Sequence, residues 1–183
     1  MIPGVENSRP LRLQRPDGFY ATPESATVAL IIAIGEYLDG PIHEPACGDG
    51  AMARVLSRHG RQVLATDLVD RGHGIPGVDF LKFGRSEQIV VTNPPYHLAD
   101  EFIATAVPGS RLVAMLLKSD YWHAASRIAL YEAFPPRQQL VLTWRLDWTG
   151  QGRPTMNCSW WVWGDHLPVA TRLLPKPTGD VFA

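Results

Sequence analysis

Val90-Val91-Thr92-Asn93-Pro94-Pro95-Tyr96 is a segment in which an apolar run meets two prolines. Residues 89–92 are apolar or β-branched, which predicts a buried strand of a parallel sheet. Each proline lacks an N–H and fixes φ near about −65°, so the strand ends there. Asn93 precedes a proline and is therefore restricted to extended backbone. The segment predicts a stiff loop at the carboxyl end of a strand, where open α/β sheets bind their ligands.

The groups in this loop suit a flat amine. Asn93 offers an amide oxygen, Pro94 offers a carbonyl, and Tyr96 offers a ring for stacking. Two acceptors can bind the two N–H groups of an exocyclic amine while the ring covers its plane. The alternative is a plain turn between a strand and a helix, and the rest of the chain decides between the two.

Further strands and helices alternate around this loop. Strands are expected at residues 41–44, 62–67, 78–81, 111–117, 139–144 and 158–163, the last two as an antiparallel hairpin. Helices are expected at 26–38, 51–58, from 97 and at 124–134; Thr22 suits the N-cap of the first and Pro23 its first position. Alternating strands and helices predict an α/β fold with a mostly parallel seven-stranded sheet and helices on both faces.

Two acids and two glycines mark the first two strand ends. Glu44 ends the strand at 41–44 and is followed by a loop with Gly48 and Gly50, which allow a tight turn and close approach of a ligand. The loop lacks the G-x-G-x-x-G spacing of dinucleotide-binding proteins. Asp67 ends the next strand, where an acid can accept hydrogen bonds from ribose hydroxyls or cap the following segment.

Composition and charge limit the classes of fold and partner that the chain can have. The 183 residues fit one domain, and 45% hydrophobic with 19% charged residues indicates a globular chain. The net charge of −1 leaves only a local patch for nucleic acid. No apolar run reaches about 18 residues, so no membrane contact is expected. Two distant cysteines suit a reducing cytoplasm, in a bacterium or a phage-infected host. We expect a flexible arm at 1–17, one domain at 18–166 and a loosely packed tail at 167–183.

Four motifs carry a family resemblance. Asn93-Pro94-Pro95-Tyr96 resembles the catalytic motif of class I S-adenosylmethionine-dependent amino-methyltransferases. Phe19-Tyr20-Ala21-Thr22-Pro23 is similar to the N-terminal cofactor motif of the adenine methyltransferases in that class, and the glycine loop and Asp67 follow in the family's order. Residues 118–136 and the final Trp-Trp-Val-Trp are similar to small phage-type adenine methyltransferases. The resemblance covers about residues 18–163 and implies a Rossmann-like methyltransferase fold.

The resemblance also implies roles for individual residues. The catalytic residues would be Asn93, Pro94 and Tyr96. Asp67 would bind the cofactor ribose, Asp79 would accept from its adenine amine, and Phe80 would cover the adenine face. S-adenosyl-L-methionine would be the cofactor, and no metal is implied. The implied cofactor-binding residues are Tyr20, Thr22, Glu44, Ala46, Gly48, Gly50, Asp67, Leu68, Asp79, Phe80 and Asn93.

The implied reaction is methyl transfer to the N6 amine of adenine in DNA, with the base flipped out of a duplex onto Tyr96. Three alternatives stay open: adenine N6 methylation of RNA, N5 methylation of protein glutamine, and a non-catalytic partner that binds nucleic acid. A separate target-recognition domain has no room here, so a partner subunit, relaxed specificity or a single-stranded substrate is expected. Trp122, Trp144 and Trp148 are expected near loops, for core packing or base stacking.

Overall fold

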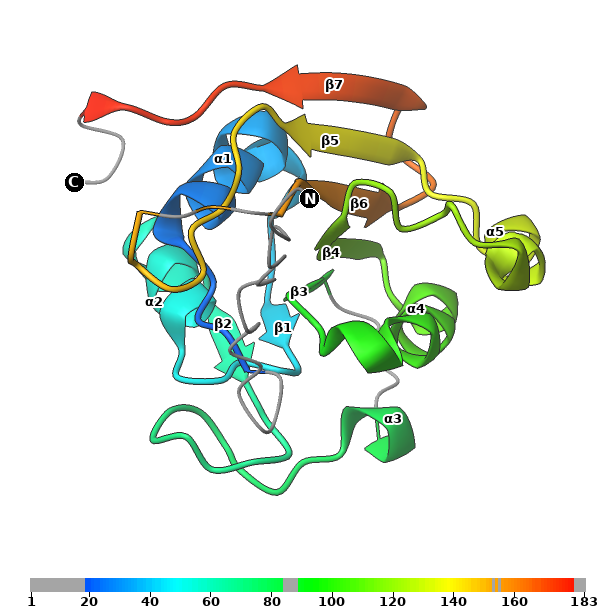
Figure 1. Ribbon diagram of the computed structural model, residues 1–183. Coiled ribbons are helices and arrows are strands. Elements are labelled where there is room, and N and C mark those ends of the chain that lie inside the picture. Colours follow the sequence, from blue (N-terminus) through cyan, green and yellow to red (C-terminus); the bar gives the residue numbers. More distant parts are fainter. Residues whose placement is uncertain (1–18, 84–88, 153, 155, 180–183) are drawn as a thin grey trace, which may run out of the picture.

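The computed structural model describes residues 19–83, 89–152, 154 and 156–179, so the arm predicted at 1–17 lies outside the described residues. Its centre is a sheet of seven strands in the order β2-β1-β3-β4-β6-β5-β7 (Figure 1). The strands are β1 (Ile42–Glu44), β2 (Val63–Ala65), β3 (Ile89–Thr92), β4 (Leu112–Lys118), β5 (Gln138–Leu142), β6 (Cys158–Trp163) and β7 (Ala170–Leu174).

The sheet is parallel except at β6. Strands β1 to β4 pair in parallel, and β6 pairs antiparallel with both β4 and β5. The predicted antiparallel hairpin at the end of the chain is therefore confirmed. Strand β7 then pairs with β5 in parallel. The mostly parallel, seven-stranded architecture agrees with the expected fold class.

Helices cover both faces of the sheet. Helices α1 (Glu24–Ile34) and α2 (Ala51–Arg58) lie on one face, and α3 (Phe80–Phe83) and α4 (Ala99–Ala106) lie on the other, with α5 (Ile128–Ala133) beyond β4 and β6 (Figure 1). Strand β4 shows why both faces need cover. Leu112, Ala114 and Leu116 pack into the first core cluster, while the residues between them pack into the second. A strand buried on both sides has to be apolar throughout, as β4 is from residue 112 to 117.

The predicted strand at 78–81 is wrong, because this segment leads into helix α3. The side chain of Asp79 accepts a hydrogen bond from the backbone N–H of Leu81 at 3.1 Å. A short acid that bonds the backbone two residues ahead favours a helix start over an extended strand. The seventh strand is instead β7.

Strand β7 lies inside the segment predicted as a loosely packed tail. It hydrogen-bonds to β5, and Leu167 and Leu174 are buried in the core. The first helix also differs slightly: Pro23 occupies the N-cap position and the helix starts at Glu24, without a side-chain cap from Thr22. An extended segment with only two inward leucines carries a weak strand signal, which explains the missed edge strand.

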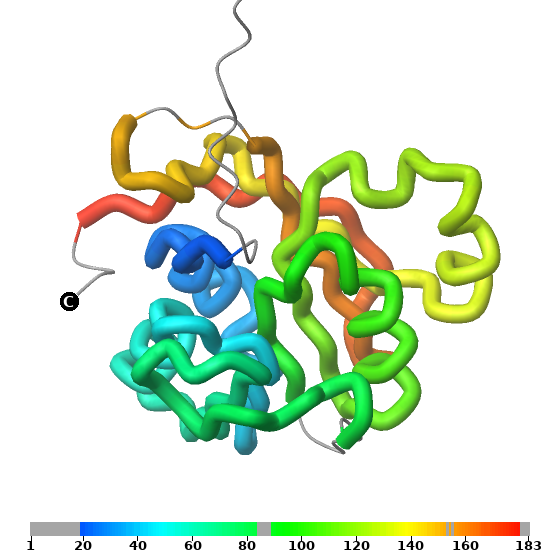
Figure 2. Tube along the Cα trace, turned by 60° about the horizontal axis from the view of Figure 1, so that its bottom comes forward, coloured from blue at the N-terminus to red at the C-terminus, as the bar shows by residue number. Residues whose placement is uncertain are grey.

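The carboxyl ends of β1, β2 and β3 face the same edge of the sheet. Figure 2 views the molecule with this edge forward, and the segment between β2 and α3 runs across it. The three tryptophans of β6 are buried, at 0%, 7% and 3% exposure, as expected for core and sheet-face residues. No helix within the described ranges has the length and apolar character needed to cross a membrane.

Candidate active site

The Asn93 side chain is held on one side and free on the other. Asn93 follows β3, and its Nδ2 donates a hydrogen bond to the hydroxyl of Thr22 at 3.2 Å. Its Oδ1 is buried and has no hydrogen-bond partner among the described residues. Thr22 is only 8% exposed, so the contact fixes the amide with its acceptor available. A buried acceptor without a partner costs about 1–3 kcal/mol, which a donor on a ligand would recover.

Tyr96 stands in an aromatic group at the same loop. Its ring meets the ring of Trp148 edge to face, with centroids 6.5 Å apart, and Trp148 meets Tyr20 at 6.4 Å. The phenol lies 4.0 Å from the sulfur of Cys158. Burial, followed by the influence of Cys158, raises the pKa of Tyr96 well above its usual value. The ring is therefore neutral and suits stacking rather than proton transfer.

The glycine loop approaches two ring side chains. Gly48 and Gly50 have φ of 57° and 81°, which only glycine adopts easily. A Cβ on Gly48 would lie 2.1 Å from Cε2 of Phe19, and a Cβ on Gly50 would lie 2.2 Å from the ring of His73. The guanidinium of Arg71 lies 4.5 Å from the centroid of Phe19. A ligand that touches these two glycines has to move both rings.

Glu44 is a buried acid at the end of β1. It is 2% exposed, and its Oε2 has no hydrogen-bond partner within the described part of the chain. Burial raises the pKa of Glu44 well above its usual value; a backbone hydrogen bond from Ala53 opposes this, and the charges of Asp67 and Asp49 add to it. A cationic ligand group beside Glu44 would restore the charged carboxylate.

Asp67 joins the loops that follow β1 and β2. Its Oδ2 accepts from the N–H of Gly48 and its Oδ1 from the N–H of Val69, both at 2.8 Å. Each oxygen keeps one lone pair for a further donor. Leu68 beside it is 62% exposed, while Ala46 in the glycine loop is half-buried. Contacts of Asp67 with ribose and of Leu68 with the cofactor stay predictions.

Asp79 and Phe80, the predicted adenine-binding pair, lie at the start of helix α3 and not on a strand. Asp79 caps α3 and pairs with Lys82 at 3.2 Å. Phe80 is 3% exposed, and its ring packs between His43 and Phe102 at centroid distances of 5.7 and 5.1 Å. Phe80 therefore belongs mainly to the core, and the role of both residues in binding adenine stays a prediction.

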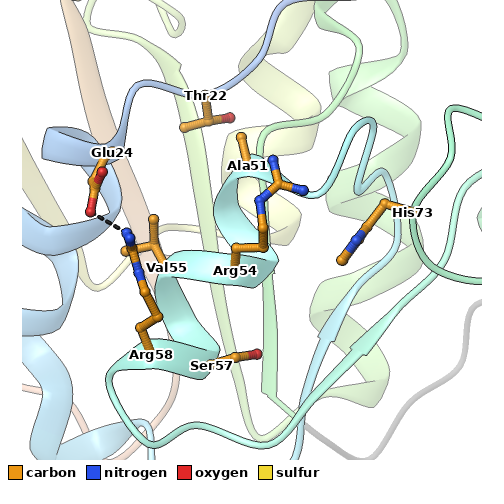
Figure 3. Close-up of a pocket in the computed structure, with 8 residues that line it drawn as sticks. All are labelled: Thr22, Glu24, Ala51, Arg54, Val55, Ser57, Arg58 and His73. Carbon is orange, nitrogen blue, oxygen red and sulfur yellow. Dashed lines mark hydrogen bonds and ion pairs between the residues drawn. The ribbon is translucent and has the colours of Figure 1, made fainter.

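Two cavities flank the loop of Asn93. One of about 480 Å³ lies between the start of α1 and the outer side of α2 (Figure 3). It is lined by Thr22, Glu24, Ala51, Arg54, Val55, Ser57, Arg58 and His73. The other, of about 270 Å³, lies beside Tyr96 at the end of β4 and is lined by Tyr96, Lys118, Asp120, Tyr121, His123 and Arg127.

The cysteines are not set up as nucleophiles or ligands. Burial, with the charges of Glu44 and Asp67, raises the pKa of Cys47 to about 12, and burial raises that of Cys158 to about 11. Both thiols are free and protonated at neutral pH. No group of three or more His, Cys, Asp or Glu among the described residues could hold a metal ion.

Four residues reach the site without having been selected from the sequence. Phe19 and His73 cover the glycines, Arg54 lines the larger cavity, and Arg127 lines the smaller one. Phe19 belongs to the Phe-Tyr-Ala-Thr-Pro motif, which is the sequence signal that points to it. The others come together only through contacts between distant segments.

Comparisons with known proteins agree on the fold. No family model matches the chain, and no protein of curated function matches it. Among solved structures, a putative RNA methyltransferase from Pyrococcus horikoshii is 15% identical, with a TM-score of 0.60 over 78% of this chain and 84% of that chain.

Two further structures show the same likeness. A putative class I S-adenosylmethionine-dependent methyltransferase from Listeria monocytogenes is 12% identical, with a TM-score of 0.60 over 86% of this chain and 66% of that chain. A modification subunit of a putative type I restriction enzyme from Vibrio vulnificus is also 12% identical, with a TM-score of 0.58 over 88% of this chain and 48% of that chain. This chain therefore has the Rossmann-like fold of class I methyltransferases.

Proposed function

We propose that this chain is an S-adenosylmethionine-dependent methyltransferase that methylates the exocyclic N6 amine of adenine in DNA. The observation that carries the proposal is the Asn93 side chain: its Nδ2 is held by Thr22, while its Oδ1 is buried without a partner. Such an acceptor, at the carboxyl end of a central parallel strand, fits an N–H donor on a substrate.

The loop residues act on the amine by position and polarity. The Asn93 Oδ1 and the Pro94 carbonyl accept its two N–H groups, which favours a pyramidal nitrogen with a localised lone pair. Holding the nitrogen in line with the methyl donor is the main source of rate. The neutral ring of Tyr96 stacks on the base. The proton lost from the methylated nitrogen goes to water, because that nitrogen is strongly acidic and needs no strong base.

The residues of the first two strand ends fit the proposed cofactor. The bound cofactor would supply an electrophilic methyl group on a sulfonium sulfur. Glu44, whose buried Oε2 has no partner among the described residues, suits a cationic group, and Asp67 has lone pairs left for hydroxyl donors. Phe19 and His73 lie on the glycines, so binding includes displacement of both rings.

The aromatic group favours a flat base over an amide side chain. Tyr96, Trp148 and Tyr20 form a chain of rings beside Asn93. Stacking on an aromatic ring contributes about 1–3 kcal/mol per base, whereas a glutamine side chain offers no comparable face. DNA is preferred as the nucleic acid because residues 118–136 and the final Trp-Trp-Val-Trp resemble small phage-type adenine methyltransferases. Target recognition would come from a partner subunit, be relaxed, or be unnecessary on a single-stranded substrate.

The test is methyl incorporation from radiolabelled S-adenosylmethionine into separate substrates: single- and double-stranded DNA, RNA of the same sequence, and a glutamine-containing protein. The proposal predicts label in DNA and N6-methyladenine after digestion. Label mainly in RNA would support the RNA alternative, and label in protein would support glutamine methylation. Cofactor binding without label in any substrate would support a non-catalytic partner.

A further inference from the structure

The larger cavity adjoins the loop proposed to hold the cofactor, and the inference drawn from it rests on the proposed function. Ala51 lines it directly after Gly50, and His73 lines it with the ring that lies on Gly50. Thr22 lines it and bonds Asn93. At about 480 Å³ the cavity has the size of a small-molecule site.

The two arginines of the cavity differ in their partners. Arg58 forms an ion pair with Glu24, drawn as a dashed line in Figure 3, so its charge is compensated. Arg54 donates from Nη1 to the backbone carbonyl of Asp49 at 2.6 Å, and no carboxylate in the described ranges forms an ion pair with it. Its guanidinium lies beside Ala51 at the N-terminal end of α2 (Figure 3). Arg54 thus brings to the cavity a cation that forms no ion pair within the described residues.

A buried acid precedes the same loop in the chain. Glu44 is 2% exposed with Oε2 unpartnered among the described residues, and the charge of Arg54 acts on it from α2. An acid at the end of β1 and a cation on α2, joined by the glycine loop, are complementary to a zwitterion. The amino-acid end of S-adenosylmethionine is such a zwitterion, with an ammonium group and a carboxylate on one carbon.

We propose that Arg54 binds the carboxylate of the cofactor's amino-acid end, opposite Glu44, which faces its ammonium group. The planar guanidinium donates two parallel N–H bonds to a carboxylate, a geometry that lysine cannot match. The Thr22 hydroxyl accepts from Asn93 and keeps its own proton to donate to the same carboxylate. This contact links the hold on the cofactor with the orientation of the amide that binds the substrate.

The test compares two ligands that differ only in the carboxylate: S-adenosylmethionine and its decarboxylated form. Isothermal titration calorimetry measures both with the unaltered chain, Arg54→Ala, Arg54→Lys and Arg58→Ala. Arg54 is exposed, so Arg54→Ala is expected to fold normally. It should weaken S-adenosylmethionine binding about fivefold, the upper end for an ion pair open to solvent. Binding of the decarboxylated form should stay the same or become slightly tighter, because a cation beside a cationic ligand is removed.

The controls separate this contact from general effects. Arg58→Ala removes a charge from the same cavity and should leave both affinities within about twofold, because Glu24 compensates that charge. Arg54→Lys should recover only part of the loss. Equal weakening of both ligands by Arg54→Ala, or of neither, would overturn the assignment of Arg54 and leave the proposed function standing. An unaltered chain that binds neither ligand would overturn the proposed function and this assignment with it.

Discussion

Alanine at Gly48 is expected to weaken cofactor binding strongly. Alanine at Gly60 serves as the control, because it carries the cost of left-handed backbone without a steric clash. Gly48 has φ 57° and Gly60 has φ 74°, so alanine at either position adopts left-handed backbone at a cost of about 1–2 kcal/mol. In a chain of this size that lowers the unfolding midpoint by about 2–8 °C. Nothing lies within 4 Å of a Cβ on Gly60, whereas one on Gly48 would lie 2.1 Å from the Phe19 ring.

The added methyl group at Gly48 occupies the surface that the cofactor would contact. Calorimetry with S-adenosylhomocysteine should give binding at least about tenfold weaker for Gly48→Ala, equal to about 1.4 kcal/mol. Gly60→Ala should bind within about twofold of the unaltered chain. Thermal unfolding of both variants checks that each is folded at the assay temperature. If the two variants bind equally well, the glycine loop is not the cofactor site.

Three other substitutions test the acid, the amide support and the ring. The pKa of Glu44 is raised in the folded state, so its contribution to stability is full below the ordinary glutamate pKa of about 4.3 and is lost as pH rises through the folded value. Glu44→Gln should therefore flatten the fall of the unfolding midpoint above that pH. An unchanged slope would contradict a raised pKa for Glu44. Thr22→Val leaves Nδ2 of Asn93 without its acceptor and should lower kcat about tenfold in steady-state assays, whereas Thr22→Ser should stay close to normal. Equal kcat in both variants would show that the hydroxyl does not position the amide. Tyr96→Ala should raise KM for DNA about fivefold or more through lost stacking, while Tyr96→Phe keeps the ring and most activity. A similar rise in KM in both variants would show that DNA binding depends on the hydroxyl and not on the ring.

Local patterns predicted the strands that matter most for the site. The apolar runs before Asn93 and Lys118 are central strands buried on both faces, so sequence and burial coincide there. The predicted strand at 78–81 was wrong because a hydrogen bond from the backbone N–H of Leu81 to the side chain of Asp79 favours a helix start. Strand β7 was not predicted because this edge strand is held by pairing with β5 rather than by an apolar pattern of its own; Leu173, for example, is 70% exposed.

The candidate site was predictable where chemistry and position are local, and hidden where it depends on contacts between segments. Asn93 and Tyr96 follow β3 and Glu44 ends β1, and the sequence places them there. The bond between Asn93 and Thr22 spans 71 positions, and the ring of Phe19 on Gly48 depends on how the N-terminal segment crosses the loop. No local pattern encodes such contacts, because the tertiary packing creates them.

The proposed reaction depends on the free Oδ1 of Asn93, which would hold the amine that is methylated. The most direct measurement is the single-turnover rate of Asn93→Ala on DNA, together with its affinity for S-adenosylhomocysteine. We expect a rate at least about a hundredfold lower, as for loss of one preorganised hydrogen-bonding group in an active site, with cofactor affinity nearly unchanged. A variant that keeps more than about a tenth of the normal rate, a loss under about 1.4 kcal/mol, would contradict it.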